Sequence, residues 1–136
     1  GVEPYLVASS LEGVLAQRLV RVLCPNCKSE DHSDKAAALK DTFNIPDAVP
    51  IFQPVGCAEC RNTGFHGRHA VFEMMSLNQK LRQHILQKCS SGELKELAIK
   101  DGMTTLSDDG WRLVREGITT PDEVLRVTKS EHVNRD

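Results

Sequence analysis

The chain has 136 residues, of which 40% are hydrophobic and 26% charged, which suits a globular protein with one core or one core plus a small module. Its net charge of −2 provides no general attraction to nucleic acid or to anionic lipid. No apolar run approaches the roughly 20 residues of a membrane span and no signal peptide opens the chain, so we expect a cytosolic protein with reduced cysteines.

The first part of the chain predicts a short helix followed by an extended segment. The sequence starts Gly1-Val2-Glu3-Pro4 without an initiator Met, and we expect a piece excised from a longer protein. Pro4 suits the first turn of a helix. Residues 13–23 alternate well enough for a strand with one apolar side, but a continuous helix also fits, and periodicity alone does not decide between them.

The middle part, residues 24–60, begins and ends with a pair of cysteines and contains four prolines. Residues 34–42 predict one short helix, and the remainder reads as loop with short extended pieces. A turn at 62–64 then leads into a predicted strand at 68–75, so that 61–75 forms a returning turn and strand.

Residues 76–128 carry four helix signals, and 129–136 are polar and predicted to be disordered. Each of the four segments combines a starting signal or a stop signal with apolar residues at helical spacing. The signals are a capping box Ser76/Gln79, a second capping box Ser90/Glu93, a stop at Gly117, and a cap with first-turn proline at Thr120-Pro121.

The strongest motif is a set of two C-x-x-C pairs, Cys24/Cys27 and Cys57/Cys60, separated by 29 residues. Two such knuckles supply the four sulfurs that zinc accepts in closed structural sites, where no position remains for water or substrate. Iron–sulfur ligation usually has more irregular spacing, and a thioredoxin-like redox pair would follow a strand into a helix. We therefore predict a structural Zn²⁺ held by these four cysteines, with Cys89 as an ordinary thiol.

Nucleic-acid binding is a common role of zinc ribbons, but the charges of this module oppose it. Three lysines and six carboxylates between 24 and 60 leave −3, and four thiolates around one Zn²⁺ add −2. A module near −5 repels a phosphate backbone.

Several stretches of the chain closely resemble the segment that follows the catalytic core in type II secretion ATPases (the E component) and type IV pilus assembly ATPases. The type II branch fits somewhat better, chiefly through Ser9-Ser10-Leu11 and Gly13 to Arg18. The resemblance is weakest across 29–54. It is carried by residues 1–27, Val55 to Cys60, Thr63 to Arg68, Val71 to Met75 and Gly117 to Thr128.

The resemblance implies an α+β fold: a short strand pair from the end of a RecA-like sheet, an inserted four-cysteine zinc subdomain, and a C-terminal helical bundle. It assigns 1–23 to the end of the ATPase core, 24–60 to the zinc subdomain, and 76–128 to the bundle. It also favours a strand at 13–23, pairing with 68–75. Such proteins are hexamers at the cytoplasmic side of the bacterial inner membrane. They power pseudopilus or pilus assembly together with inner-membrane platform proteins, so any membrane contact of this chain would be indirect.

The chain contains no G-x-x-x-x-G-K-[ST] phosphate loop, so ATP and Mg²⁺ belong to the full-length protein and we expect this polypeptide to be noncatalytic alone. Gln17, Arg18 and Arg68 are candidates for support of a subunit interface or nucleotide pocket in the hexamer; the competing interpretation is solvated strand edges. An alternative function is a freestanding zinc-stabilised adaptor that recruits a protein partner.

Overall fold

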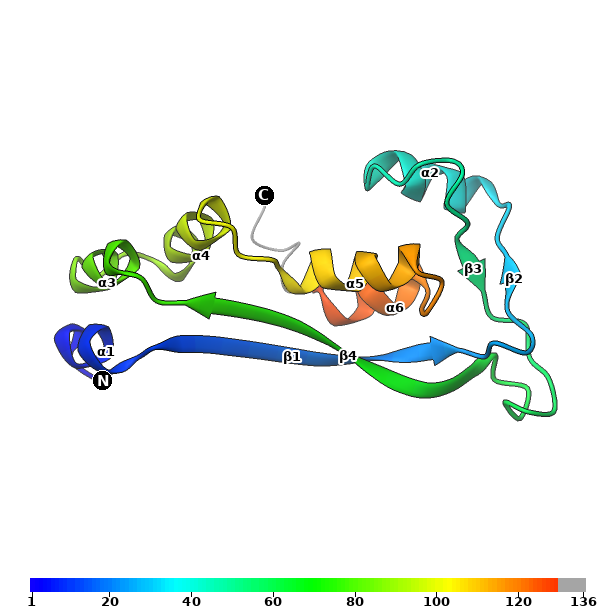
Figure 1. Cartoon of the computed structure of the whole chain (residues 1–136), viewed down its shortest axis with the longest axis horizontal. Helices are drawn as coiled ribbons and strands as arrows, with labels where there is room; N and C mark the ends of the chain where they lie inside the picture. The colour runs from blue at the N-terminus through cyan, green and yellow to red at the C-terminus, as the bar shows by residue number, and fades with distance from the viewer. Residues whose placement is uncertain (130–136) are drawn as a thin grey trace. The chain divides into compact units, whose positions relative to one another are not determined.

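The structure is a computed structural model of the chain, in which residues 1–129 are described; the predicted tail lies outside them except for Lys129. The fold class is α+β, with six helices and two two-stranded sheets in the described residues (Figure 1). No helix in the described range is both long and apolar enough to cross a membrane. The elements are α1 (Pro4–Ser10), β1 (Gly13–Leu23), β2 (Ser29–Glu30), α2 (Asp34–Thr42), β3 (Phe52–Gln53), β4 (Phe65–Ser76), α3 (Gln79–Leu86), α4 (Ser91–Lys100), α5 (Leu106–Arg115) and α6 (Pro121–Val127).

Two long strands, β1 and β4, form a two-stranded sheet and run in opposite directions (Figure 1). The segment 13–23, for which helix and strand both fitted the sequence, is therefore a strand. The strand predicted at 68–75 is present and longer, because it begins at Phe65. A second sheet pairs β2 with β3 in antiparallel register, with Ser29 opposite Gln53 and Glu30 opposite Phe52.

The chain divides into two compact units, and β1 and β4 each contribute residues to both. The first unit comprises 1–17 and 72–106 and contains α1, α3 and α4. Its core consists of Leu77, Leu81 and Ala98, against which Met75, Ile85, Leu94, Leu97 and Met103 pack. The Arg82 guanidinium donates a hydrogen bond to the carbonyl of Ala8, which ties α3 to α1.

The second unit comprises 18–71 and the chain from 107 onward, with α2, α5 and α6. Trp111 of α5 stacks on Phe43 with ring centroids 3.9 Å apart, inside a core that also contains Ile45, Ile51, Val114 and Val124. Gly110 lets α6 approach α5 closely, because a Cβ atom there would lie 2.7 Å from Cγ1 of Val124. The four predicted helices after residue 76 are all present, two in each unit.

The helix starts agree with the predicted caps at two of three positions. Ser90 and Glu93 form the predicted capping box, and Thr120 caps α6 by accepting the N–H of Glu123 at 3.2 Å. The box predicted at Ser76 is wrong: β4 continues through Ser76, and α3 begins after Asn78, whose side chain accepts the N–H of Leu81. An Asn at the N-cap satisfies the same free donors as a Ser would.

Candidate metal centre

The first knuckle, Cys24 to Cys27, begins directly after the last residue of β1. Its turn is closed by the N–H groups of Cys27 and Lys28, which both donate to the carbonyl of Cys24, at 3.3 and 3.0 Å. The Cys24 N–H donates to the carbonyl of Gly64 at 2.9 Å, so the first knuckle is hydrogen-bonded to the loop that follows the second.

The second knuckle, Cys57 to Cys60, is closed by the Asn62 N–H, which donates to the carbonyl of Cys57 at 2.8 Å. The chain then turns sharply into β4 through residues with positive φ, among them Asn62 (61°) and Gly64 (78°). Gly64 cannot be replaced without displacing its surroundings, because a Cβ there would lie 2.4 Å from Cβ of Pro54. The turn therefore requires glycine at position 64 for two reasons: the backbone has a positive φ, and Pro54 leaves no space for a Cβ atom.

The four sulfurs lie together at the tips of the two knuckles, and all four cysteines are free thiols. Every pair of sulfurs is within 4.8 Å, and three pairs are separated by 3.8 Å: Cys24–Cys57, Cys27–Cys60 and Cys57–Cys60. A tetrahedral Zn²⁺ with Zn–S bonds of about 2.3 Å has sulfurs about 3.8 Å apart along each edge. The donor set and the spacing therefore fit a four-sulfur metal site.

Hydrogen-bond donors surround the sulfurs unequally. Cys60 Sγ accepts the backbone N–H groups of Cys57 and Gly64, both at 3.2 Å, whereas Cys27 Sγ accepts that of Gly56 at 3.3 Å. The side-chain amide of Asn26 donates to Cys57 Sγ at 3.3 Å. The described residues provide no N–H donor for Cys24 Sγ.

These donors set the acidity of the thiols. Burial opposes ionisation of Cys60, but its two backbone donors outweigh that effect and lower the pKa of the thiol to about 6. For Cys57 the Asn26 amide is the largest cause of a lowered pKa. Burial and the neighbouring thiols raise the pKa of Cys27 to about 11. One thiol thus ionises readily, and a bound cation would drive deprotonation of the others.

Contacts from Lys28 and Phe52 connect the first knuckle to the loop between α5 and α6. The Lys28 ammonium donates to the carbonyl of Gly117 at 2.8 Å and lies 4.5 Å from the ring centroid of Phe52. The Leu23 N–H donates to the carbonyl of Ile118 at 2.8 Å. The cysteine cluster is therefore attached to a chain segment from the opposite end of the sequence.

A buried carboxylate, Glu123, reinforces the same connection. Its oxygens accept the backbone N–H of Arg21 at 2.8 Å and pair with the guanidinium groups of Arg21 (2.9 Å) and Arg126 (2.8 Å). Burial raises the pKa of Glu123, but these three sets of donors prevail and lower it to about 2. Arg21 also lies over the ring of Phe65, 4.1 Å from its centroid, so this group joins β1, β4 and α6.

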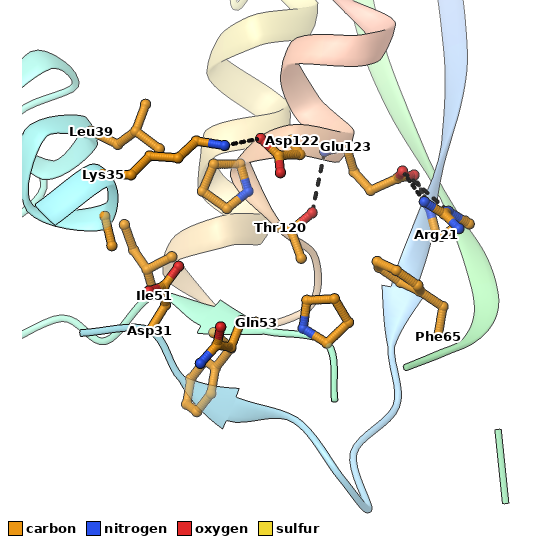
Figure 2. Close-up of a pocket in the computed structure, with 14 residues that line it drawn as sticks. Arg21, Asp31, Lys35, Leu39, Ile51, Gln53, Phe65, Thr120, Asp122 and Glu123 are labelled. Carbon is orange, nitrogen blue, oxygen red and sulfur yellow. Dashed lines mark hydrogen bonds and ion pairs between the residues drawn. The ribbon is translucent and has the colours of Figure 1, made fainter. Parts of the chain in front are cut away.

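A hollow of about 200 Å³ lies beside this group, between α2, β3 and the start of α6 (Figure 2). Four of its five charged groups form ion pairs, since Lys35 contacts Asp122 at 2.9 Å and Arg21 contacts Glu123 (Figure 2). The fifth, Asp31, accepts the backbone N–H of Ser33 at 2.9 Å. None of the four cysteines is among the residues that line it. Much of the remaining lining is apolar, with side chains such as Leu39 and Phe65.

The other residues selected from the sequence lie on the two long strands. Gln17 and Arg18 are consecutive and exposed on β1, and Arg68 is exposed on β4. Gln17 and Arg18 both take part in interactions, and none of the three belongs to the cysteine cluster. The sequence reasoning missed Asn26, Arg21 and Glu123. Only Asn26 had a local signal, namely a polar side chain inside a C-x-x-C knuckle.

Comparison with known proteins extends over nearly the whole chain. The sequence model of the family described as "Type II/IV secretion system protein" matches residues 1–126. The type IV pilus assembly ATPase TfpB of Acinetobacter baylyi is 45% identical over 129 residues, covering 93% of this chain and 22% of that protein. Type II secretion system protein E of Pseudomonas aeruginosa is 41% identical, covering 96% and 26%. PilB of Myxococcus xanthus, also a type IV pilus assembly ATPase, is 40% identical, covering 92% and 23%. The chain therefore spans about a quarter of the length of these relatives.

Proposed function

This chain belongs to the type II/IV secretion system protein family, and on that premise we propose that it is the zinc-stabilised C-terminal portion of a secretion motor ATPase. The observation that carries the proposal is the four-sulfur cluster, whose 3.8 Å spacings match a zinc tetrahedron, inside a chain matched by the family over residues 1–126. For the full-length protein we propose a hexameric motor that powers type II secretion, as the sequence resemblance implies.

The zinc has a structural role in this proposal. Cys24, Cys27, Cys57 and Cys60 fill all four positions of a tetrahedral ion and leave none for water or a substrate. The two-residue strands β2 and β3 are too short to hold the knuckles together, so the metal would serve to cross-link them. The rest of the segment between the knuckles packs into the core of the second unit through Phe43, Ile45 and Ile51. Zinc supplies a cross-link here, while the protein supplies four deprotonated sulfurs and the donors that stabilise them.

Catalysis is assigned to parts of the full-length protein that this chain does not contain. The chain lacks a phosphate-loop sequence, and the named relatives described as ATPases are about four times longer. We place Gln17, Arg18 and Arg68 at a subunit interface or beside the nucleotide pocket of the hexamer, because all three side chains are exposed on β1 and β4. The proposed partners are the other subunits and inner-membrane platform proteins, on the cytoplasmic side.

Metal analysis of purified variants tests the centre. We expect one equivalent of zinc in the parent chain, and loss of zinc together with loss of the far-ultraviolet circular dichroism of the native fold in Cys24→Ser and Cys57→Ser. Cys89→Ser is the matched control, because Cys89 lies outside the cluster. One equivalent of zinc retained by either knuckle variant would contradict the ligand assignment.

Genetic complementation tests whether the full-length motor acts in type II secretion rather than in pilus assembly. The full-length gene should restore export of a secreted enzyme in a strain lacking its type II ATPase, and the Cys57→Ser form should not. Restoration of pilus extension without restoration of secretion would reassign the motor to the pilus branch.

A further inference from the structure

The hydrogen bonds to the four sulfurs differ in kind as well as in number. The donors to Cys27 and Cys60 are backbone N–H groups of Gly56, Cys57 and Gly64, which the course of the chain fixes. Cys57 instead accepts a hydrogen bond from the amide of Asn26, the only side-chain donor to the cluster among residues 1–129. A single substitution can therefore remove this donor without altering the backbone.

The Asn26 hydrogen bond also joins the two knuckles. Asn26 is the third residue of Cys24-Pro25-Asn26-Cys27, whereas its acceptor belongs to the second knuckle, 31 positions later. The corresponding third position of the second knuckle is Glu59, whose side chain carries no N–H group to donate. The two knuckles are therefore not equivalent, and only the first extends a side-chain donor across the site.

We propose that Asn26 is a positioning residue of the metal centre, whose amide holds Cys57 Sγ in place for the cation and thereby determines how tightly the metal is retained. This inference rests on the proposed four-cysteine centre. A metal-bound thiolate carries negative charge, and a hydrogen bond to a charged acceptor is stronger than one between neutral groups. Groups that orient metal ligands typically change metal affinity by 10- to 100-fold.

Exposure of the Asn26 side chain sets the expected size of the effect. Water can reach Cys57 when the amide is removed, and it can replace part of the lost hydrogen bond. We therefore expect the low end of the range, a roughly tenfold weaker affinity for Asn26→Ala. Asn26→Asp should weaken binding further, because it keeps the size of the side chain but places a carboxylate beside a thiolate.

The experiment measures Zn²⁺ and Co²⁺ affinity of the complete chain by competition with a chromophoric chelator. Gln53→Ala is the control, because this exposed amide is equally polar and contacts none of the sulfurs. The sulfur-to-cobalt charge-transfer band provides a second readout. Loss of a hydrogen bond raises the energy of the sulfur lone pair, so the band should move to lower energy in Asn26→Ala and remain unchanged in Gln53→Ala.

The possible results separate this inference from the function on which it rests. An Asn26→Ala affinity within twofold of the parent, with an unmoved charge-transfer band, would overturn the role of Asn26 while leaving the metal centre intact. A parent chain that takes up no metal would overturn the four-cysteine centre itself. Weaker binding in both Asn26 variants, in the stated order and with a shifted band, supports the proposal.

Discussion

Glu123 makes the stability of the chain depend on pH, and Glu123→Gln is the substitution that measures this dependence. A carboxyl whose pKa falls from 4.5 to about 2 on folding stabilises the protein by roughly 3 kcal/mol at neutral pH. The side chains of Arg21 and Arg126 are 54% and 53% exposed, and solvent screens part of this interaction. We therefore expect a loss of about 2 kcal/mol for Glu123→Gln at pH 7.

The direction of the pH dependence follows from the lowered pKa. As the pH falls, Glu123 is protonated at a higher pH in the unfolded chain than in the folded one. The stabilisation is therefore complete above pH 4.5 and is lost as the pH falls toward 2. About a quarter of the difference between parent and variant should be gone at pH 4, and more than half at pH 3. Urea unfolding at pH 7, 4 and 3 measures this, with a midpoint difference of about 1 M at pH 7.

Acid also protonates Cys60, whose thiol has a pKa of about 6, and comparison of the two proteins at the same pH removes that contribution because it affects both alike. Glu96→Gln is the control, since Glu96 is exposed and is not a partner of Arg21 or Arg126, and we expect it to cost less than about 0.5 kcal/mol at pH 7. A Glu123→Gln stability within 0.5 kcal/mol of the parent at pH 7, or a difference that stays constant down to pH 3, would refute the reasoning.

Three further predictions concern other sites. Gly64→Ala should lower the free energy of unfolding by more than about 2 kcal/mol and weaken metal binding. Gly67→Ala, at a similar φ of 81° but with open space around it, should lower it by only about 1 kcal/mol. Equal losses in urea unfolding would contradict the steric part of this argument. Trp111→Phe should lower the free energy of unfolding by less than about 1.5 kcal/mol, because it removes a buried indole N–H that has no hydrogen-bond partner in the described part of the chain. Trp111→Ala should lower it by about 3–5 kcal/mol. A loss of the same size in both variants would show that the indole N–H makes a hydrogen bond. The isolated chain should bind ATP weakly or not at all in calorimetric titration, and a saturable micromolar isotherm would contradict the assignment of the nucleotide site to other parts of the protein.

The gathering of the four cysteines was predictable from the sequence, because the spacing of two C-x-x-C pairs is a local property that directly reflects the geometry of a knuckle. Helix starts at Ser90 and Thr120 were predictable for the same reason, since a cap and its partner lie within one turn. Ser76 failed because the strand before it continues one residue into the capping signal, and Asn78 was available two residues later. The limit of β4 depends on its pairing with β1, which no local pattern records.

Glu123 illustrates what could not be predicted. The sequence predicted a cap with first-turn proline at Thr120-Pro121, and Thr120 does cap α6 by accepting the N–H of Glu123. The carboxylate itself turns to Arg21, 102 positions earlier, because only the folded chain brings a backbone N–H and two guanidinium groups to one place. A buried acid is stable there only with those donors. Arg126 lies three residues further along α6, but Arg21 is brought to Glu123 by tertiary structure, which no local spacing reveals.

The contacts between the first knuckle and the α5–α6 loop can form only late in synthesis of the chain. All four cysteines have been synthesised by residue 60, yet Lys28 bonds to a carbonyl 89 positions later and Arg21 accepts the hydroxyl of Thr119, 98 positions later. As the chain emerges from the ribosome, the thiols are present before the segment that holds their framework in place. Such distant contacts close slowly, so the nascent polypeptide spends an interval with accessible sulfurs and an unfinished surround. During that interval its thiols are more open to oxidation than those of the finished protein.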